Sequence, residues 1–175
     1  KANAAFMGIG KTKRVVLSDT LIQNFTHAEI ETVVAHELGH YKHHDVWRLL
    51  AFGLLVSLVA FAAGFLGMNA LVPVLSLQSA ADVAGLPLLF LIFYAVNLVL
   101  MPMMNGYSRP RENAADLFAL ETIKDKEVFI SCMEKLGKQN LADPIPPAWY
   151  EWLFYDHPSI GKRIAMAARW NRENE

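Results

Sequence analysis

Two long stretches without a single charged side chain constrain this chain more than any other feature. The first covers residues 49–68 and stays apolar to about residue 77, and the second covers residues 86–104. A polar break at residues 76–85 separates them. A helix needs roughly 20 apolar residues to cross a bilayer, and core helices of soluble proteins seldom stay uncharged for so long. The sequence therefore predicts a transmembrane helical hairpin, with a pair of buried core helices as the alternative.

The hairpin also predicts which side of the membrane its flanking segments occupy. A chain that crosses twice returns to the side that it left, so both flanking segments face one compartment. The outer ends of the hairpin carry the positive charges Lys42, Arg48, Arg109 and Arg111, whereas the break between the stretches has no Lys or Arg. By the positive-inside rule, the flanking segments of this integral, multi-pass protein are expected on the cytoplasmic side.

The composition narrows the classes of protein further. Hydrophobic residues make up 54% and charged residues 19% of the chain, which is apolar for a soluble domain. The net charge of -1 and the lack of a basic run argue against a nucleic-acid partner. A single cysteine, Cys132, cannot form an internal disulfide, so a reducing compartment is permitted. The 175 residues suit one compact domain, and a start at Lys1 with no visible signal peptide points to a fragment of a longer protein.

The segment His36-Glu37-Leu38-Gly39-His40 carries the chemistry. Histidines four residues apart share one face of a helix, one turn apart, so both imidazoles can reach a single small cation. Glu37 lies beside them, where it can hold the attacking water without being a ligand. Two imidazoles on Zn²⁺, a glutamate base and an open position for water form the zincin pattern. The same pentapeptide also occurs by chance as a polar stripe on an ordinary helix, so other segments must support it.

A helix is predicted to carry this motif. Thr26 followed by Glu29 forms a capping box at its start. Its apolar face is formed by Ile30, Val33, Val34 and Leu38. Gly39 costs about 1 kcal/mol inside a helix, and its small size is expected to let another segment come close to the metal, unless the glycine is merely tolerated.

A third metal ligand is expected from the segment SRPRENAAD at residues 108–116. A catalytic zinc with two histidines lacks one protein ligand, which is a glutamate in thermolysin-type sites. Glu112 is the best candidate, and its alternative is an exposed glutamate on a helix. Asp116 lies four residues later on the same helix face, where it is suited to orient a ligand histidine. Pro110 is expected in the first turn of this helix.

The remaining segments predict short elements around the motifs. Residues 3–10 and 14–18 are typical of two strands of a hairpin, and residues 19–23 turn toward the helix that carries the histidines. Residues 125–140 form an amphipathic helix with an apolar face made by Val128, Phe129, Cys132, Met133 and Leu136. The fold class is therefore mainly α, a zincin-type metalloprotease domain with a small β-hairpin or edge strand and an inserted transmembrane hairpin.

The C-terminal part holds an aromatic cluster and two further candidate residues. The cluster consists of Trp149, Trp152, Phe154 and Tyr155, which pack the core, sit at the membrane interface or line an apolar cleft. His157 precedes Pro158, which is expected at the first position of a last helix, and Arg163 follows about two turns along. Taken alone, His157 and Arg163 are a capping histidine and a surface arginine.

Four separated motifs in this order closely resemble the type I CAAX prenyl protease family of integral-membrane zinc metalloproteases. The motifs are NAAFMGIGKTKRVVLSDTLI, HELGH, SRPRENAAD and HPSIGKRI, and they span nearly the whole chain. The related HtpX-like membrane proteases share the zinc motifs but resemble GKTKRVVLSDTLI less well. Members of the family often carry a histidine where this chain has Asp45 and a second proline where it has Ser159. They also have several upstream spanning helices that this sequence lacks.

The resemblance assigns roles to residues of this chain. It implies that one Zn²⁺ ion per chain is held by His36, His40 and Glu112. It implies that Glu37 is the catalytic base and that Asp116 lies behind a zinc ligand. It implies that the substrate backbone or the oxyanion is contacted by Asn3, His157 and Arg163.

The expected function is zinc-dependent hydrolysis of peptide bonds at a membrane, of the kind that processes CAAX segments. The expected partners are a peptide or protein substrate, membrane-associated or lipidated, and the lipid bilayer. The alternatives are a general quality-control protease of membrane proteins and a non-catalytic, zinc-binding membrane scaffold. One membrane-embedded metalloprotease domain is expected over residues 1–175. Residues 1–48 form its edge strands and zinc helix, residues 49–104 the hairpin, and residues 105–175 the glutamate-ligand helix and C-terminal helices.

Overall fold

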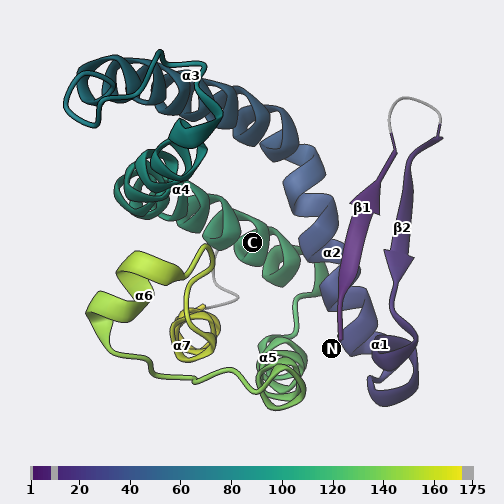
Figure 1. Ribbon diagram of the computed structural model, residues 1–175. Coiled ribbons are helices and arrows are strands. Elements are labelled where there is room, and N and C mark those ends of the chain that lie inside the picture. Colours follow the sequence, from purple (N-terminus) through teal and green to yellow (C-terminus); the bar gives the residue numbers. More distant parts are fainter. Residues whose placement is uncertain (1, 9–11, 171–175) are drawn as a thin grey trace.

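The computed structural model describes residues 2–8 and 12–170 as a mainly helical fold with one two-stranded sheet (Figure 1). The elements are β1 (Ala4–Met7), β2 (Arg14–Leu17), α1 (Asp19–Asn24), α2 (His27–Lys42), α3 (Asp45–Leu71), the 3₁₀ turn η2 (Val83–Gly85), α4 (Leu86–Ile123), α5 (Lys126–Asn140), α6 (Ala148–Phe154) and α7 (Ile160–Arg169). The predicted fold class is confirmed, because helices dominate and an apolar helical hairpin is inserted between the HELGH helix and the segment that carries Glu112.

The two strands form the antiparallel hairpin that the sequence predicts. Ala4 lies opposite Leu17 in the register of β1 and β2. Ser18 extends the pairing, since its N–H donates to the carbonyl of Asn3 at 3.0 Å and its Oγ accepts the N–H of Asn3 at 2.9 Å. Residues 9–11, in the expected break between the strands, lie outside the described residues.

The segment that was expected only to turn toward the next helix is itself the short helix α1. The Oγ of Ser18 accepts the N–H of Leu21 at 3.3 Å, and Asp19 in the first turn suits the positive end of the helix. Leu21 is fully buried. Six residues are too few to show helical periodicity in a sequence, so the cap and the burial of one leucine decide the structure here.

Helix α2 begins at the predicted capping box, which also ties it to α5. Thr26 Oγ1 accepts the N–H of Glu29 at 3.3 Å, and Glu29 Oε2 accepts the N–H of Thr26 at 2.8 Å. The same carboxylate accepts hydrogen bonds from Ser131 and Lys135 of α5, both at 2.7 Å. Glu29 is only 3% exposed, so a residue that starts one helix also stabilises the contact between two.

Glu29 makes the stability of the fold depend on pH. Burial raises its pKa, but Lys135 and the hydrogen bonds from Thr26 and Ser131 outweigh burial and lower the pKa from 4.5 to about 2. Its stabilisation is therefore fully present above pH 4.5 and is lost as the pH falls toward 2. We expect Glu29→Gln to lower the free energy of unfolding by about 3 kcal/mol at neutral pH and by much less in strong acid. Denaturation midpoints across this range test it, with the exposed Glu134→Gln as control, and an equal loss at all pH values would contradict the ionic origin.

Helices α3 and α4 contain the two uncharged stretches and pack against each other. Each is long and apolar enough to cross a membrane, and only 6% of its most apolar window is buried. Gly64 lies so close to Phe93 that a Cβ would come within 2.9 Å of the ring. Apolar side chains point away from the contact, for example Phe65 and Phe90, which are 69% and 68% exposed. This exposure within the described residues disfavours the alternative of buried core helices.

Helix α4 continues without interruption through Pro102 and Pro110 over 38 residues. The prediction that a new helix starts at Pro110 was wrong. Each proline removes one backbone hydrogen bond without ending the helix. Packing against α2 and α3 stabilises the rest of the helix. One continuous element therefore carries both the second apolar stretch and Glu112.

Helices α5, α6 and α7 complete the fold beside α2 and α4 (Figure 1). The predicted apolar face of α5 is confirmed, with its buried part formed by Phe129, Cys132 and Met133. Helix α7 begins at Ile160 and not, as predicted, at Pro158. The reason is that Ser159 is extended and donates its N–H to the carboxylate of Glu151 at 3.0 Å, so the turn before it cannot be helical.

Candidate metalloprotease site

Close contact between α2 and α4 brings the two parts of the metal motif together. A Cβ on Gly39 would lie 2.9 Å from the Cα of Ala115, closer than real side chains allow. The glycine therefore lets the two helices approach, as the sequence analysis expected. This approach places the face of α2 that carries His36 and His40 opposite Glu112 on α4.

The three predicted ligand side chains converge on one point. Nε2 of His36 lies 3.4 Å from Oε2 of Glu112, and Nε2 of His40 lies 3.3 Å from Oε1 of Glu112. The two Nε2 atoms are 3.1 Å apart, and one ligand atom from each residue lies within 4.8 Å of the others. Glu112 is 6% exposed, so the alternative of an exposed helix glutamate is excluded.

A carboxylate lies behind each of the two histidines. Nδ1 of His36 is 2.8 Å from Oδ1 of Asp116, and Nδ1 of His40 is 3.0 Å from Oδ2 of Asp45. An ionised carboxylate only accepts hydrogen bonds, so Nδ1 is the donor in both rings. In the neutral rings, the lone pair of each Nε2 is therefore directed toward the point where the ligands meet.

Asp45 is the site residue that the sequence analysis missed, since it noted the position only as a departure from the family. Its side chain is buried, and besides His40 it has the guanidinium groups of Arg48 and Arg111 at 3.9 Å. After α2 the chain turns through His44, which has a left-handed backbone (φ 56), and this turn returns Asp45 to His40. The sequence shows an acidic residue five positions after the second histidine, which could have suggested a contact between them. The spacing of residues does not predict the turn at His44 that makes this contact possible.

The residues fit a zinc-like cation. Oε2 of Glu112 is buried and forms no hydrogen bond within the described part of the chain. Burial disfavours charge on His40, yet Glu112 and Asp45 raise its pKa to about 9. Burial likewise opposes charge on His36, but Asp116 and Glu112 raise its pKa. The cluster therefore stabilises positive charge, and two imidazole nitrogens with one carboxylate form a donor set that suits Zn²⁺.

Arg163 binds the same carboxylate of Asp116 that His36 contacts. Its Nε and Nη2 donate to the two carboxylate oxygens at 2.7 and 2.5 Å, and its side chain is 11% exposed. Such a bidentate pair holds the carboxylate in a fixed orientation. The geometry supports a role for Arg163 in positioning His36 through Asp116, and the substrate contact that the resemblance implies stays a prediction.

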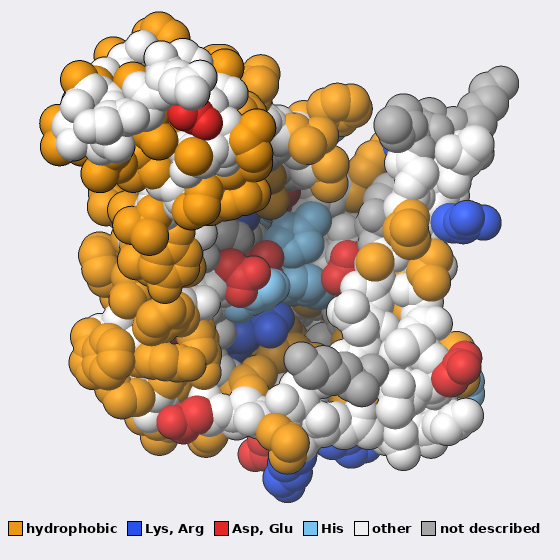
Figure 2. All heavy atoms as spheres, in the orientation of Figure 1, with side chains coloured by type: hydrophobic (Ala, Val, Ile, Leu, Met, Phe, Trp, Pro, Cys, Tyr) orange, Lys and Arg blue, Asp and Glu red, His pale blue; other side chains and the backbone are white. Residues whose placement is uncertain are grey.

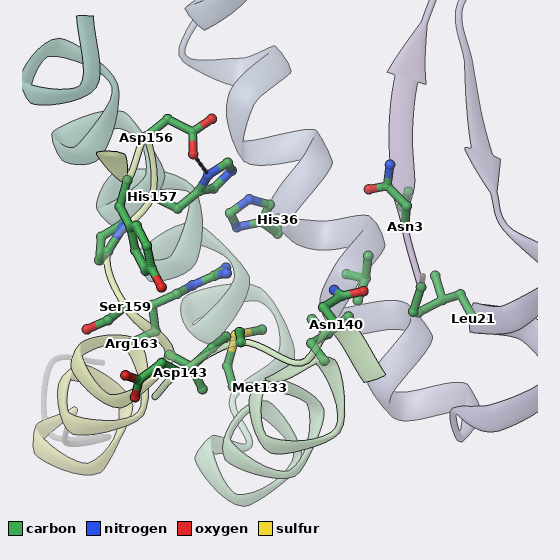
Figure 3. A pocket seen from close by; sticks show the side chains of 18 of the residues that line it. Asn3, Leu21, His36, Met133, Asn140, Asp143, Asp156, His157, Ser159 and Arg163 are labelled. Carbon is green, nitrogen blue, oxygen red and sulfur yellow. Dashed lines mark hydrogen bonds and ion pairs between the residues drawn. The ribbon is translucent and has the colours of Figure 1, made fainter. Parts of the chain in front are cut away.

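The segment before α7 brings His157 to the metal cluster. Nε2 of His157 lies 3.4 Å from Oε2 of Glu112, and its Nδ1 lies 2.7 Å from Oδ1 of Asp156 (Figure 3). Its side chain is half exposed. Two residues later, the N–H of Ser159 is bound by the carboxylate of Glu151 on α6. The backbone is therefore anchored while the imidazole points into the cleft.

A cleft of about 560 Å³ adjoins the cluster. Its walls include Asn3, His36, Glu37, His157 and Arg163. In Figure 3, Asn3 faces the cleft from the side opposite His157, with His36 between them. Figure 2 shows the histidines inside a hollow, with acidic and basic side chains around them and hydrophobic surface along its rim. The predicted site residues from both ends of the chain thus line one cavity or the cluster beside it.

We expect Asp45→Asn to weaken metal binding by about 10- to 100-fold. The amide has the size of the carboxylate but not its charge, so it holds the Nδ1–H of His40 less firmly and polarises the ring less. Competition with a chelator of known affinity measures the effect. Asp19→Asn, an exposed change on α1, is the matched control, and equal metal affinity in the two variants would contradict the role of Asp45.

Comparisons with known proteins agree with this geometry. A family model described as Peptidase family M48 matches residues 1–171. The uncharacterized metalloprotease YhfN of Bacillus subtilis (strain 168) is 34% identical over 175 residues, which cover 95% of this chain and 40% of that protein. A CAAX prenyl protease 1 homolog of Oryza sativa subsp. japonica is 33% identical over 168 residues, covering 94% and 39%. The chain thus spans about two fifths of the length of these relatives.

A solved structure shares the fold. The crystal structure of S. mikatae Ste24p superposes with a TM-score of 0.73 over 94% of this chain and 41% of that chain, at 23% sequence identity. This likeness places α2, α4 and their inserted apolar hairpin in a known architecture. The family model extends over almost the whole sequence, including the HELGH helix and the segment of Glu112. The chain therefore belongs to peptidase family M48.

Proposed function

We propose that this chain forms the catalytic part of a zinc-dependent membrane endopeptidase. The observation that carries the proposal is the convergence of His36, His40 and Glu112, with Glu37 on the wall of the adjoining cleft. A metal-dependent peptidase family supports hydrolysis as the reaction. A purely structural zinc site has no use for a base beside it, so Glu37 argues against a non-catalytic scaffold.

The chain's own residues would share the work of hydrolysis. A zinc ion in this site would act as a Lewis acid and lower the pKa of water to about 7. Glu37 accepts the proton of the attacking water and later passes a proton to the leaving amine. His157 donates a hydrogen bond to the oxyanion. Asp116 and Asp45 keep the two ligand imidazoles in the tautomer that leaves Nε2 available.

The substrate is proposed to bind in an extended form along β1. Asn3 lies just before this strand and lines the cleft. Within the described residues, β1 pairs with β2 on one edge and with no strand on the other. A peptide can add to such an edge through backbone hydrogen bonds, which would direct its chain across the cleft toward His157.

Helices α3 and α4 are proposed to cross the membrane, which makes the protein multi-pass and places the site on the cytoplasmic side. The supports are the length and apolarity of both helices and the positive charges at their outer ends. One domain is proposed, in which residues 49–104 are an insertion between the zinc helix and the glutamate-ligand helix. The name of the rice relative motivates lipidated C-terminal segments as substrates.

Metal analysis of His40→Ala tests the proposal. We expect about one zinc per unaltered chain, bound by two imidazoles and one carboxylate, and loss of zinc and of hydrolysis together in the variant. His27→Ala, an exposed change at the start of the same helix, should retain both. Zinc occupancy that His40→Ala leaves unchanged would rule the site out.

A comparison of a prenylated peptide with its unprenylated form separates CAAX processing from general quality control. A CAAX protease is expected to prefer the prenylated peptide, whereas a quality-control protease is expected to cleave both peptides equally.

A further inference from the structure

Helix α6 carries an aromatic face that the described residues do not cover. The face consists of Trp149, Tyr150 and Trp152, which are between 41% and 65% exposed. The one charged residue of α6, Glu151, is buried and bound by Lys162 at 2.8 Å. The exposed side of α6 is therefore aromatic and uncharged. Because these side chains are exposed, they do not pack in the core of the described residues.

Helix α6 is held at the point where the uncharged stretch of α4 ends. Asn105, the first residue after that stretch, donates from its side chain to the carbonyl of Leu153 at 2.7 Å. One turn further along α4, Arg109 donates to the carbonyl of Tyr155 at 2.8 Å. These carbonyls belong to the C-terminal end of α6, where a cation is favourable. The bonds set the depth of α6 relative to the apolar half of α4.

We propose that α6 lies in the interfacial layer of the bilayer that α3 and α4 cross, with its aromatic face toward the lipid. The inference rests on the proposed membrane hairpin. Trp and Tyr concentrate at the headgroup level because their rings are amphipathic, and a helix with one uncharged face can lie in that plane. In Figure 2, hydrophobic side chains continue along one side of the molecule from the hairpin to the place of α6 in Figure 1.

This placement puts the cleft beside the membrane surface. Phe154 and Tyr155, at the end of α6, line the cleft. Glu151 of the same helix binds the N–H of Ser159, next to the segment that carries His157. The scissile bond of a substrate would therefore lie within a few residues of the bilayer. The chemistry favours peptides that are tethered to, or emerge from, a lipid surface.

Nitroxide labels on the full chain in lipid nanodiscs test this inference. Single cysteines replace Trp152 on α6, Phe65 on α3 and Leu141, an apolar residue at the end of α5 that is 92% exposed. Cys132, the one cysteine of the sequence, is fully buried, and burial raises its pKa to about 12, so it does not compete for the label. Collisions with oxygen, which enriches in lipid, are compared with collisions with a water-soluble nickel chelate.

We expect the oxygen-to-nickel collision ratio at Trp152→Cys to exceed that at Leu141→Cys several-fold and to approach that at Phe65→Cys. A ratio at Trp152→Cys equal to that at Leu141→Cys would overturn the placement of α6. A label that neither reagent reaches would also overturn it, because protein would then cover the face. A water-like ratio at Phe65→Cys would instead refute the membrane hairpin. Retained metal content shows that each variant is folded.

Discussion

Glu37→Gln is expected to lower kcat/KM for peptide hydrolysis about 100- to 10,000-fold, the range typical of a lost general base. The amide has nearly the same size and still lines the cleft, but it cannot accept a proton from the attacking water. The side chains that converge on the metal position come from other residues. Zinc content is therefore expected to stay near that of the unaltered chain, and peptide cleavage and elemental analysis of one preparation measure both.

Glu31→Gln is the matched control for this variant. Glu31 lies on the exposed side of the same helix, so the same change of charge should leave both activity and zinc unaltered. Near-normal turnover in Glu37→Gln would show that another group is the base. Loss of zinc together with activity would instead move Glu37 from the role of base to that of ligand.

His157→Phe is expected to lower kcat about 100-fold or more, with zinc content intact. The imidazole lies 3.4 Å from the carboxylate of Glu112, at the edge of the metal cluster and on the cleft. A hydrogen bond to the oxyanion exists mainly in the transition state, so its loss lowers kcat and kcat/KM together and changes KM little. Phenylalanine fills similar space but donates no hydrogen bond.

A structural role for His157 predicts a different result. Loss of a cap would lower stability by about 1 kcal/mol and spare turnover. Measurement of kcat, zinc content and melting temperature on the same variant separates the two roles, with His27→Phe as a control at an exposed histidine. Normal kcat with a lowered melting temperature would refute the catalytic role.

Features that depend on neighbouring residues could be predicted from the sequence alone. The capping box of Thr26 and Glu29, the shared helix face of His36 and His40, and the apolar face of α5 depend on helical geometry within a few turns. The two uncharged stretches were also predicted as long helices, because a helix forms its backbone hydrogen bonds within one segment. Glu112 could be named as the best candidate because a catalytic zinc with two histidines needs a third protein ligand.

The tertiary structure decided the features that join distant segments. Contact between α2 and α4 carries Glu112 to the histidines, and the turn through His44 carries Asp45 to His40. The chain from Arg163 through Asp116 to His36 likewise depends on how α7 docks. Side chains far apart in sequence meet only through the packing of whole helices, and the spacing of residues along the sequence does not predict that packing. The sequence by itself therefore determined the chemistry available to this chain, and the packing of its helices decided which carboxylate lies behind each histidine.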